Sequence, residues 1–438
     1  MLNKWLFTHI DNSALIVFRI IFGALITLEA VGAIFTGWIH RSLIEPEFTF
    51  NFIGFDFLQP LPGNGMIWYY AIMGLFGIMV MLGYKFRISI LCYTLMWTGV
   101  YLMQKSSYNN HYYLLMLLCF LMFLLPAHRY ASIDAKQNPD IKKISMPRWC
   151  WLLIVLQMWI VYTYAAFAKL YPDWLDATVP EILMRSKADF WLVGGILQEE
   201  WTHYVIAWFG ILFDLLIIPL LLIRRTRMVA FVAAIFFHLF NSFIFHIGIF
   251  PYLSLALIVF FFPSQKIHRI FLKRKPFYDK KELIIPSYRK PLLIFLGLWF
   301  AIQIGLPLRH WFFQDNVLWT EEGHRMSWRM MLRARSGIAN YTVVDKATGD
   351  SIRINKSDYL TPKQVRSASS KPDIIWQFAQ HLKDDYAQRG MDVEVYVDSR
   401  ISINGRPYKV FIDPTVDLGA EQWKHFSHHD WILPSRLD

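Results

Sequence analysis

Residues 150–170 read CWLLIVLQMWIVYTYAAFAKL, an apolar stretch long enough to cross a lipid bilayer as a single helix. The only charged residue in it is Lys169, one position from its end. Hydrophobic residues make up 55% of the 438-residue chain and charged residues 18%, a composition typical of membrane proteins. The sequence therefore predicts an integral membrane protein in which Lys169 lies near one end of a span.

Eight further apolar segments accompany this one, which predicts a polytopic α-helical protein with about nine transmembrane helices. The nine lie at residues 14–35, 66–82, 88–103, 111–125, 150–170, 203–223, 228–247, 249–262 and 291–308. Several are shorter than the roughly 20 residues of an untilted span. No small-residue cleavage site follows the first segment, so we interpret it as a retained helix and not as a signal peptide.

Lysine and arginine are divided unevenly between the two alternating sets of loops. The set that includes the start of the chain contains 20 of them, and the other set contains four. Loops on the cytoplasmic side carry the Lys and Arg excess. We therefore expect a cytoplasmic N-terminus, a membrane domain over residues 1–308 that carries the site, and an exoplasmic domain over residues 309–438.

The last 130 residues differ from the rest in their pattern of apolar and polar residues. Alternating stretches such as YTVVDKATGDSIRI (341–354) and VEVYVDSRISINGRPYKVFIDP (393–414) contain TGD and NGR turn signals. Between them, residues 374–388 have apolar side chains at helical spacing. This region is predicted to be a small β-rich α+β domain with one amphipathic helix.

Several other classes of partner are disfavoured by the sequence. The net charge of +11 sits mostly in short loops, so it indicates membrane topology and not nucleic-acid binding. All three cysteines lie in or beside apolar segments without metal-ligand spacing. The tail stretch HFSHHD (425–430) is too loosely spaced for a metal site. We therefore expect membrane lipid as a partner, and neither metal nor nucleic acid; nothing in the sequence indicates an oligomeric state.

With this topology, four separated segments bring polar groups to the outer side of the membrane. They are Asn109, Asn110 and His111 before the fourth span, Lys169 at the end of the fifth, His238, Asn241 and His246 in the seventh, and PLRHWFF with GHRMSWRMMLRARSG after the ninth. A lysine in a low-dielectric pocket favours its neutral amine, which can act as a general base. Nearby amides and histidines can orient a substrate oxygen or stabilise an oxyanion.

Structural explanations stay open for the same groups. They are snorkelling to the headgroups for Lys169, helix capping for Asn109 or Asn110, and ordinary interhelical bonds for His238 and His246. Three charged residues inside spans, Arg19, Glu29 and Asp214, are interpreted as a structural charge network.

Ordered motifs along nearly the whole chain resemble those of the vitamin K-dependent gamma-glutamyl carboxylases and their bacterial relatives, which share the HTTM transmembrane domain. The motifs are FRIIFG (18–23), YNNHYYL (108–114), AKLYPDW (168–174), FHLFNSFIFHIGIFPY (237–252), PLRHWF (307–312), SWRMM (327–331) and SINGRPYKVFIDPTVDL (402–418). Any one motif is weak, but in this order they are strongly specific for the family.

The resemblance implies an enzyme that uses a reduced naphthoquinone (vitamin K or a menaquinol-type hydroquinone), O2 and CO2. In this chemistry the quinol is oxygenated to an epoxide, and the strong base so formed allows carboxylation of a glutamate in a peptide or protein. By motif position, Lys169 matches the catalytic lysine, and Asn110 and His111 match an essential pair. His238, Asn241 and His246 fall in the motif assigned to quinone binding or site shaping, and Trp328 and Arg335 to the glutamate substrate.

The chain also departs from the animal enzymes. Arg329 stands where they have an acidic residue, and Arg333 where they have a histidine, while Arg335 keeps their arginine. The animal proteins continue well beyond position 438 with lumenal sequence that recruits propeptide-bearing substrates. We therefore expect a bacterial inner-membrane protein with a periplasmic tail, in preference to an endoplasmic reticulum protein, and we do not extend propeptide-guided recruitment to this chain.

Two other functions are considered for the same sequence. An integral-membrane carrier is suggested by Asp214 and Pro219 in one span, although carriers place their polar groups near the membrane midplane. A non-catalytic quinone-binding protein of the same fold would tolerate replacement of Lys169, which the enzyme would not.

Overall fold

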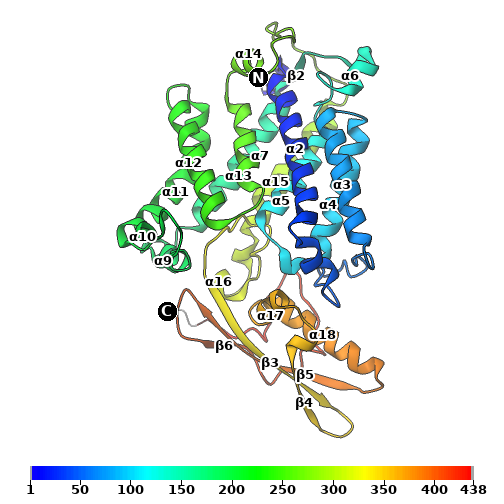
Figure 1. Cartoon of the computed structure of the whole chain (residues 1–438), viewed down its shortest axis with the longest axis vertical. Coiled ribbons are helices and arrows are strands. Elements are labelled where there is room, and N and C mark those ends of the chain that lie inside the picture. The colour runs from blue at the N-terminus through cyan, green and yellow to red at the C-terminus, as the bar shows by residue number, and fades with distance from the viewer. Residues whose placement is uncertain (1, 436–438) are drawn as a thin grey trace.

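The computed structural model describes residues 2–435 and consists of a long helical bundle joined at one end to a small sheet domain (Figure 1). Each of the nine apolar segments forms a helix, so the polytopic helical fold is confirmed. The helices are α2 (Ser13–Phe35), α3 (Gly65–Leu82), α4 (Phe86–Met103), α5 (Asn110–Leu124), α7 (Arg148–Ala168), α11 (Glu200–Leu222), α12 (Arg227–Phe245), α13 (Phe250–Leu257) with η4 (Ile258–Phe261), and α15 (Arg289–Leu308).

Seven of these helices, within residues 2–435, are long and apolar enough to cross a membrane. The other two are shorter. α5 has 15 residues, which at 1.5 Å per residue covers about 22 Å of a hydrocarbon core that is about 30 Å thick. α13 and η4 bend by 116° into α14 (Ser264–Phe271). The prediction of about nine spans is therefore compatible with the fold, with α5 and the bent pair as its shorter members.

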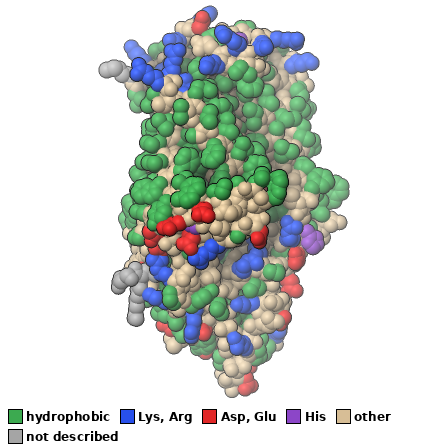
Figure 2. Space-filling view, turned by 60° about the vertical axis from the view of Figure 1, so that its left-hand side comes forward, with side chains coloured by type: hydrophobic (Ala, Val, Ile, Leu, Met, Phe, Trp, Pro, Cys, Tyr) green, Lys and Arg blue, Asp and Glu red, His purple; other side chains and the backbone are tan. Residues whose placement is uncertain are grey.

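The side chains on the bundle surface match a membrane location. Figure 2 shows, on the face in view, a broad apolar band between Lys and Arg at one end and the mixed charges of the sheet domain at the other. Many large apolar side chains of α3, α11, α12 and α15 are exposed within this band. Such a surface is stable only in contact with lipid or another apolar partner, so the chain is an integral membrane protein.

The end of the bundle away from the sheet domain is closed by short elements. They are α1 (Leu2–Phe7), β1 (His9–Asp11), α6 (Ile133–Gln137), η3 (Pro139–Ile141) and β2 (Ser145–Pro147), with β1 and β2 antiparallel. A buried ion pair joins the Lys275 Nζ to a carboxylate oxygen of Asp11 at 2.5 Å. This pair fixes the linker after α14 to the start of the chain.

Helices α2 and α3 approach each other closely through glycine. A Cβ atom added at Gly23 would lie 2.4 Å from the Cα of Met81, and one added at Gly77 would lie 2.5 Å from the Thr27 hydroxyl. Small residues allow the backbones of two membrane helices to come into contact. By contrast, a Cβ at Gly32 of α2 would meet nothing within 4 Å.

Replacing Gly23 by alanine is therefore expected to destabilise the protein by about 1–3 kcal/mol, because the added methyl forces two backbones apart. Gly32→Ala is the matched control in the same helix, and it should be neutral or stabilising by about 0.4–1 kcal/mol. Thermal unfolding in detergent would compare the two variants. Equal midpoints for both would show that the glycine contact does not limit the packing.

The sheet domain has four antiparallel strands in the order β4-β3-β5-β6. Their bounds are β3 (Arg335–Asp345), β4 (Ser351–Ile354), β5 (Val393–Ile403) and β6 (Lys409–Ile412). Strands β3 and β5 pair along their whole length, with Tyr341 opposite Val397. The predicted hairpins around the TGD and NGR turns are β3–β4 and β5–β6.

One face of this sheet is covered by helices α17 (Pro362–Ala368) and α18 (Pro372–Gln388), which follow the short η6 (Lys356–Asp358) (Figure 1). The ring centroids of Tyr341 on β3 and Phe378 on α18 lie 4.8 Å apart in an edge-to-face arrangement. Ile374, Ile375 and Leu382 of α18 are fully buried in the same core. The predicted amphipathic helix over residues 374–388 is thereby confirmed, together with the β-rich α+β domain.

Two irregular regions join the bundle to the sheet domain. The first contains short helices between α7 and α11, namely α8 (Pro172–Leu175), α9 (Thr178–Arg185) and α10 (Gly194–Leu197). The second is residues 309–334, here called the connecting segment, with η5 (Arg309–Phe312) and α16 (Val317–Thr320). Loops with η1 (His40–Ile44) and η2 (Lys105–Ser107) complete the boundary.

Candidate functional site

An apolar cavity of about 340 Å³ lies among α7, α11 and α12, near the sheet domain. Aromatic and aliphatic side chains form most of its wall, including Phe209, Phe236, Phe237 and Phe240. The short helices α9 and α10 contribute further apolar residues. A cavity with this lining suits a hydrophobic ring system and excludes water from any charged group inside it.

Two charged residues face each other in this apolar wall. Lys169 ends α7, and its Nζ donates to a carboxylate oxygen of Asp214 on α11 at 2.5 Å and to the Ala165 carbonyl at 3.2 Å. Both side chains are buried, with 9% and 6% of their surface exposed. The lysine is therefore not a lone amine, as its sequence context suggested, but one half of a buried ion pair, and Asp214 belongs to the site.

The three intramembrane charges do not form the single network that we expected. Arg19 donates to the carbonyl oxygens of Ala127, Tyr130 and Ala131 near the opposite end of the bundle. Glu29 bonds to the Tyr112 side chain, and Asp214 bonds to Lys169. The prediction was wrong because Arg19 and Glu29 are separated by about 15 Å along α2, and Asp214 lies on α11 with Lys169 as its partner.

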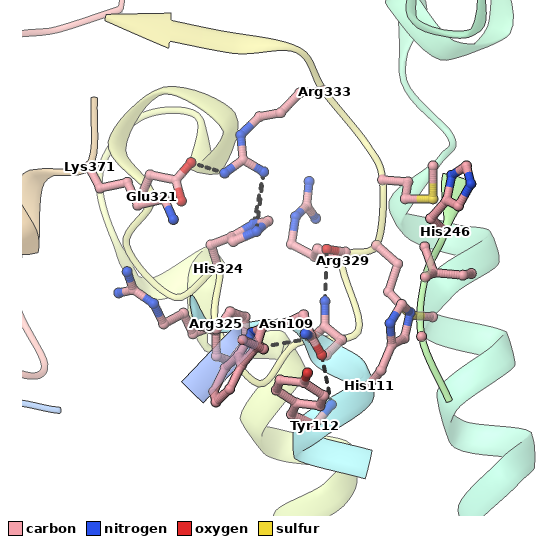
Figure 3. Close-up of a pocket in the computed structure, with 17 residues that line it drawn as sticks. Asn109, His111, Tyr112, His246, Glu321, His324, Arg325, Arg329, Arg333 and Lys371 are labelled. Atoms are coloured by element: carbon pink, nitrogen blue, oxygen red, sulfur yellow. Dashed lines mark hydrogen bonds and ion pairs between the residues drawn. The ribbon is translucent and has the colours of Figure 1, made fainter. Parts of the chain in front are cut away.

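A second and more polar cavity, of about 530 Å³, lies beside the first (Figure 3). Its wall combines the start of α5 with the connecting segment and the start of α18. The charged and imidazole side chains that line it are His111, His246, Glu321, His324, Arg325, Arg329, Arg333 and Lys371. Cations thus outnumber carboxylates in the wall, which suits an anionic ligand.

The two carboxylates near this cavity each hold more than one cation. Glu321 forms a very short contact with Arg333 and lies 3.7 Å from an Arg335 nitrogen. Asp373, at the first turn of α18, accepts from Arg325 at 2.5 Å and forms an ion pair with Lys105 at 2.7 Å. Burial alone would raise the pKa of Asp373, but Arg325 and Lys105 hold it well below its usual range.

Burial and mutual repulsion weaken the charged forms of the cations. The pKa of Arg333 is lowered to about 9 by burial and by Arg335. The pKa of Lys371 is lowered to about 7 by burial and by Arg325, against an opposing effect of Asp373. The pKa of His324 is far below normal because this side chain is buried among cations. Its neutral ring accepts a hydrogen bond from Arg333.

The two cavities share part of their walls. His111, Ile247, Met330 and Met331 line both of them. The His111 ring stacks on Phe250, with 4.3 Å between the ring centroids. A ligand in the apolar cavity and one in the polar cavity would therefore be separated by one layer of side chains.

The connecting segment carries an unusual backbone where it forms this layer. Glu321, Met326, Trp328 and Met331 have positive φ angles of 61°, 57°, 57° and 50°. Residues other than glycine rarely adopt this conformation, which persists only where surrounding contacts hold it, often at functional sites.

Hydrogen bonds from the bundle hold the connecting segment in place. The Asn110 amide donates to the Arg329 carbonyl at 3.1 Å. The Tyr108 hydroxyl accepts from the Met326 amide at 2.6 Å and donates to the Asn110 side chain at 2.8 Å. Asn109, not Asn110, caps α5, because its side chain accepts from the Tyr112 amide. The Asn110 side chain is therefore not used as the helix cap and instead holds the connecting segment at Arg329.

The residues anticipated from the seventh span are divided between the cavities. Asn241 lines the apolar cavity, and the exposed His246 lines the polar one. His238 lies behind the wall, where its Nε2 is 2.9 Å from the hydroxyl of Tyr162, which does line the apolar cavity. His238 and Asn241 lie on one helical face, but only Asn241 contacts the cavity.

The two residues anticipated for the glutamate site lie outside the cavity wall. Trp328 is buried against Tyr113, with ring centroids 4.9 Å apart. Arg335 is buried and donates to the carbonyls of Leu318, Trp319 and Ser370. These two side chains support the connecting segment from behind. The neighbouring arginines Arg329 and Arg333, which depart from the animal pattern, line the cavity instead.

Sequence reasoning missed several residues of the site. Glu321 and Lys371 line the polar cavity, and Asp214 the apolar one. Only Asp214 carried a signal, since an acid inside a span is rare and usually has a partner. Lys371 reaches the site through the docking of α18, which no local pattern reveals.

Comparison with protein families agrees with the motifs. A model described as the HTTM domain matches residues 7–265, more than half of the chain, and a model described as the vitamin K-dependent gamma-carboxylase lumenal domain matches residues 288–438. No solved structure matches the chain. The match by two models in succession accounts for both the helical bundle and the sheet domain. The chain therefore belongs to the vitamin K-dependent gamma-carboxylase family.

Proposed function

We propose that this protein oxygenates a reduced naphthoquinone to its epoxide and couples that reaction to carboxylation of glutamate in a peptide or protein. In the net reaction, reduced quinone, O2, CO2 and a glutamate γ-C–H bond give quinone epoxide, water and γ-carboxyglutamate. The quinone contributes the redox chemistry, because its oxygenation supplies a base strong enough to remove the γ-proton. The observation that carries the proposal is the shared wall between an apolar cavity with a buried ion pair and a cationic cavity.

The apolar cavity fits a naphthoquinone with an isoprenoid tail. Its wall is mostly apolar, and Lys169 and Asp214 are its charged residues, with His111, Tyr162, Thr202 and Asn241 as further polar groups. Val205 and Phe236 line it and are also 53% and 63% exposed on the bundle surface. The cavity therefore reaches the lipid-facing side between α11 and α12, where a tail can extend into the membrane.

We assign proton removal from the quinol to the Lys169–Asp214 pair. In an ion pair the proton acceptor is the Asp214 carboxylate, while the Lys169 ammonium stabilises the negative charge that develops on the quinol oxygen. One proton then moves from that oxygen to the pair. The low polarity of the surrounding wall strengthens both interactions.

The polar cavity is assigned to the glutamate side chain. Arginine side chains in its wall match a carboxylate in charge and in hydrogen-bonding geometry. His111 lies in the shared wall and is assigned to orient or protonate groups that pass between the cavities. Asn110 holds the segment that carries Arg329, which makes it a positioning residue.

The distribution of charge supports one direction of the protein in the membrane. Lys and Arg cluster at the bundle end opposite the sheet domain (Figure 2), which favours a cytoplasmic location for that end. Both cavities would then lie near the outer leaflet, with the sheet domain in the periplasm or a lumen. A peptide substrate would approach from that side.

Turnover by the purified protein tests the proposed function directly. The protein in lipid would be given reduced vitamin K, O2, labelled CO2 and a glutamate peptide, and both epoxide and label in the peptide would be measured. Epoxide with labelled peptide supports the full proposal, whereas epoxide alone limits the protein to quinol oxygenation. Bound quinone without epoxide would favour a quinone-binding protein, and quinone transport without epoxide a carrier.

Replacing Asn110 by alanine should raise the KM for the glutamate peptide about tenfold while changing kcat much less. The variant loses its bond to the Arg329 carbonyl, and such a bond contributes about 0.5–1.5 kcal/mol. Asn109→Ala is the neighbouring control; loss of its helix cap should cost about 1 kcal/mol of stability without changing that KM. Equal KM values for the two variants would contradict the assigned role of Asn110.

Peptide binding should weaken as the pH rises from about 6 to 8. The pKa of Lys371 is about 7, so its positive charge is present below this pH and is lost above it. The charged groups that act on Lys371 are Arg325, Asp373, Arg333 and Lys363. Affinity of the glutamate peptide measured against pH would show the change. The Lys371→Arg variant, which keeps its charge, should flatten the profile, and an unchanged profile would assign the titration to another group.

A further inference from the structure

The cations around the polar cavity are not balanced by the carboxylates beside it. Each carboxylate is shared by two cations. Glu321 forms ion pairs with Arg333 and Arg335, and Asp373 forms ion pairs with Arg325 and Lys105. Within residues 2–435, Arg329 and Lys371 have no carboxylate within ion-pair distance, although both line the cavity. The cavity wall therefore holds two cationic side chains without an anionic partner of their own.

In the described part of the chain, the Arg329 side chain has an unsatisfied hydrogen-bond donor. Its Nε is buried and has no hydrogen-bond partner among the residues that the structure describes. Asn110 fixes its backbone carbonyl, so the side chain starts from a defined position. A buried N–H without a partner is costly, and an anion bound at this guanidinium would reduce that cost.

These cations surround the His324 side chain. Figure 3 shows Arg325, Arg329, Arg333 and Lys371 arranged around His324. The charges of Arg325, Arg329 and Lys371, and of Arg335 behind the wall, all act on the His324 ring. The wall is therefore positive as a whole and not only at one arginine.

We propose that the polar cavity is a receptor for a geminal dicarboxylate, and that Arg329 and Lys371 make it bind γ-carboxyglutamate more tightly than glutamate. This inference rests on the proposed function. A single γ-carboxylate offsets one of the two cations, whereas the carboxylated product carries two carboxylates on one carbon and offsets both. Addition of CO2 is then favoured in the site, and release of the product becomes slow.

Malonate and propionate separate this idea from ordinary anion binding, since they differ by one carboxylate. Binding of each to the purified full-length protein without quinone would be measured by calorimetry near pH 6.5, with inorganic phosphate as a third probe. Malonate should bind about tenfold more tightly than propionate, because one additional charge contact of about 1.4 kcal/mol gives that factor. Equal affinities, or phosphate binding tighter than malonate, would overturn the proposal.

Two variants locate the preference in the cavity. Arg329→Gln and Lys371→Met should each reduce malonate affinity to near that of propionate, and Lys371→Met keeps the test decisive where Arg329→Gln does not fold. Arg400→Gln on the exposed strand β5 is the matched control and should leave both affinities unchanged. Retention of malonate preference in both cavity variants would place the site elsewhere. Since no quinone is present, a protein that makes no epoxide can still pass this test, and one that makes epoxide can fail it.

Discussion

Lys169→Met is expected to lower the rate of epoxide formation by about 10²- to 10⁴-fold, the range contributed by positioned acid–base groups. Methionine keeps the length and apolar character of the side chain but removes the ammonium that is 2.5 Å from Asp214. The quinol oxygen then loses its stabilising charge, and the Asp214 carboxylate is left buried without a cation. Epoxide formed per enzyme under saturating reduced quinone is the measurement.

Loss of activity in this variant must be separated from loss of folding. Breaking a buried ion pair typically costs about 3–5 kcal/mol because one charge stays uncompensated. The double variant Lys169→Met with Asp214→Asn removes both charges and should recover most of the stability lost by the single variants. It should stay inactive. A double variant that forms epoxide at the normal rate would show that the pair is structural.

Asp373→Asn is expected to destabilise the protein by about 3–5 kcal/mol and to weaken glutamate-peptide binding strongly. Asp373 forms ion pairs with Lys105 from the bundle and with Arg325 from the connecting segment, and its side chain is 5% exposed. Without the carboxylate, two buried cations repel each other at the boundary between the domains. Thermal unfolding and peptide KM would be measured together.

The control for this variant is Asp398→Asn, which removes a carboxylate from an exposed pair with Arg400. Exposed pairs contribute about 0–1 kcal/mol, so its unfolding midpoint should hardly change. The pKa of Asp373 is depressed in the folded protein. Its stabilising effect is therefore present above the ordinary aspartate pKa of about 4 and is lost as the pH falls below it. A difference between wild type and Asp373→Asn that stays constant into acid would contradict this account.

The helical bundle could be predicted from sequence because hydrophobicity is a local property. All nine apolar segments are helices, and the two shortest segments, 111–125 and 249–262, are the short helix and the bent one. Strand alternation and turn residues predicted the sheet domain for the same reason. The helices α9 and α10 were missed because they are too short to have a clear period.

The site was only partly predictable, since it depends on which faces of distant elements meet. The motif around Lys169 identified the lysine, but its partner comes from a helix 45 residues further on. Helical spacing placed His238 and Asn241 on one face, yet the cavity reaches only Asn241. Arg325, Arg329 and Arg333 of the connecting segment line the polar cavity, whereas Arg335, the first residue of β3, donates to backbone carbonyls behind it. The spacing of these arginines in the sequence does not reveal which of them face the cavity.

Under the proposed function, the exposure of the cavity-lining residues Val205 on α11 and Phe236 on α12 affects how quinone kinetics should be expressed. A quinone that arrives from the lipid is present at a concentration per membrane area, whereas a peptide is present per volume of water. Adding lipid or detergent at constant total quinone dilutes the first substrate and leaves the second unchanged. The apparent KM for quinone is therefore a mole fraction in the membrane, and values in molar units from different preparations cannot be compared until they are converted.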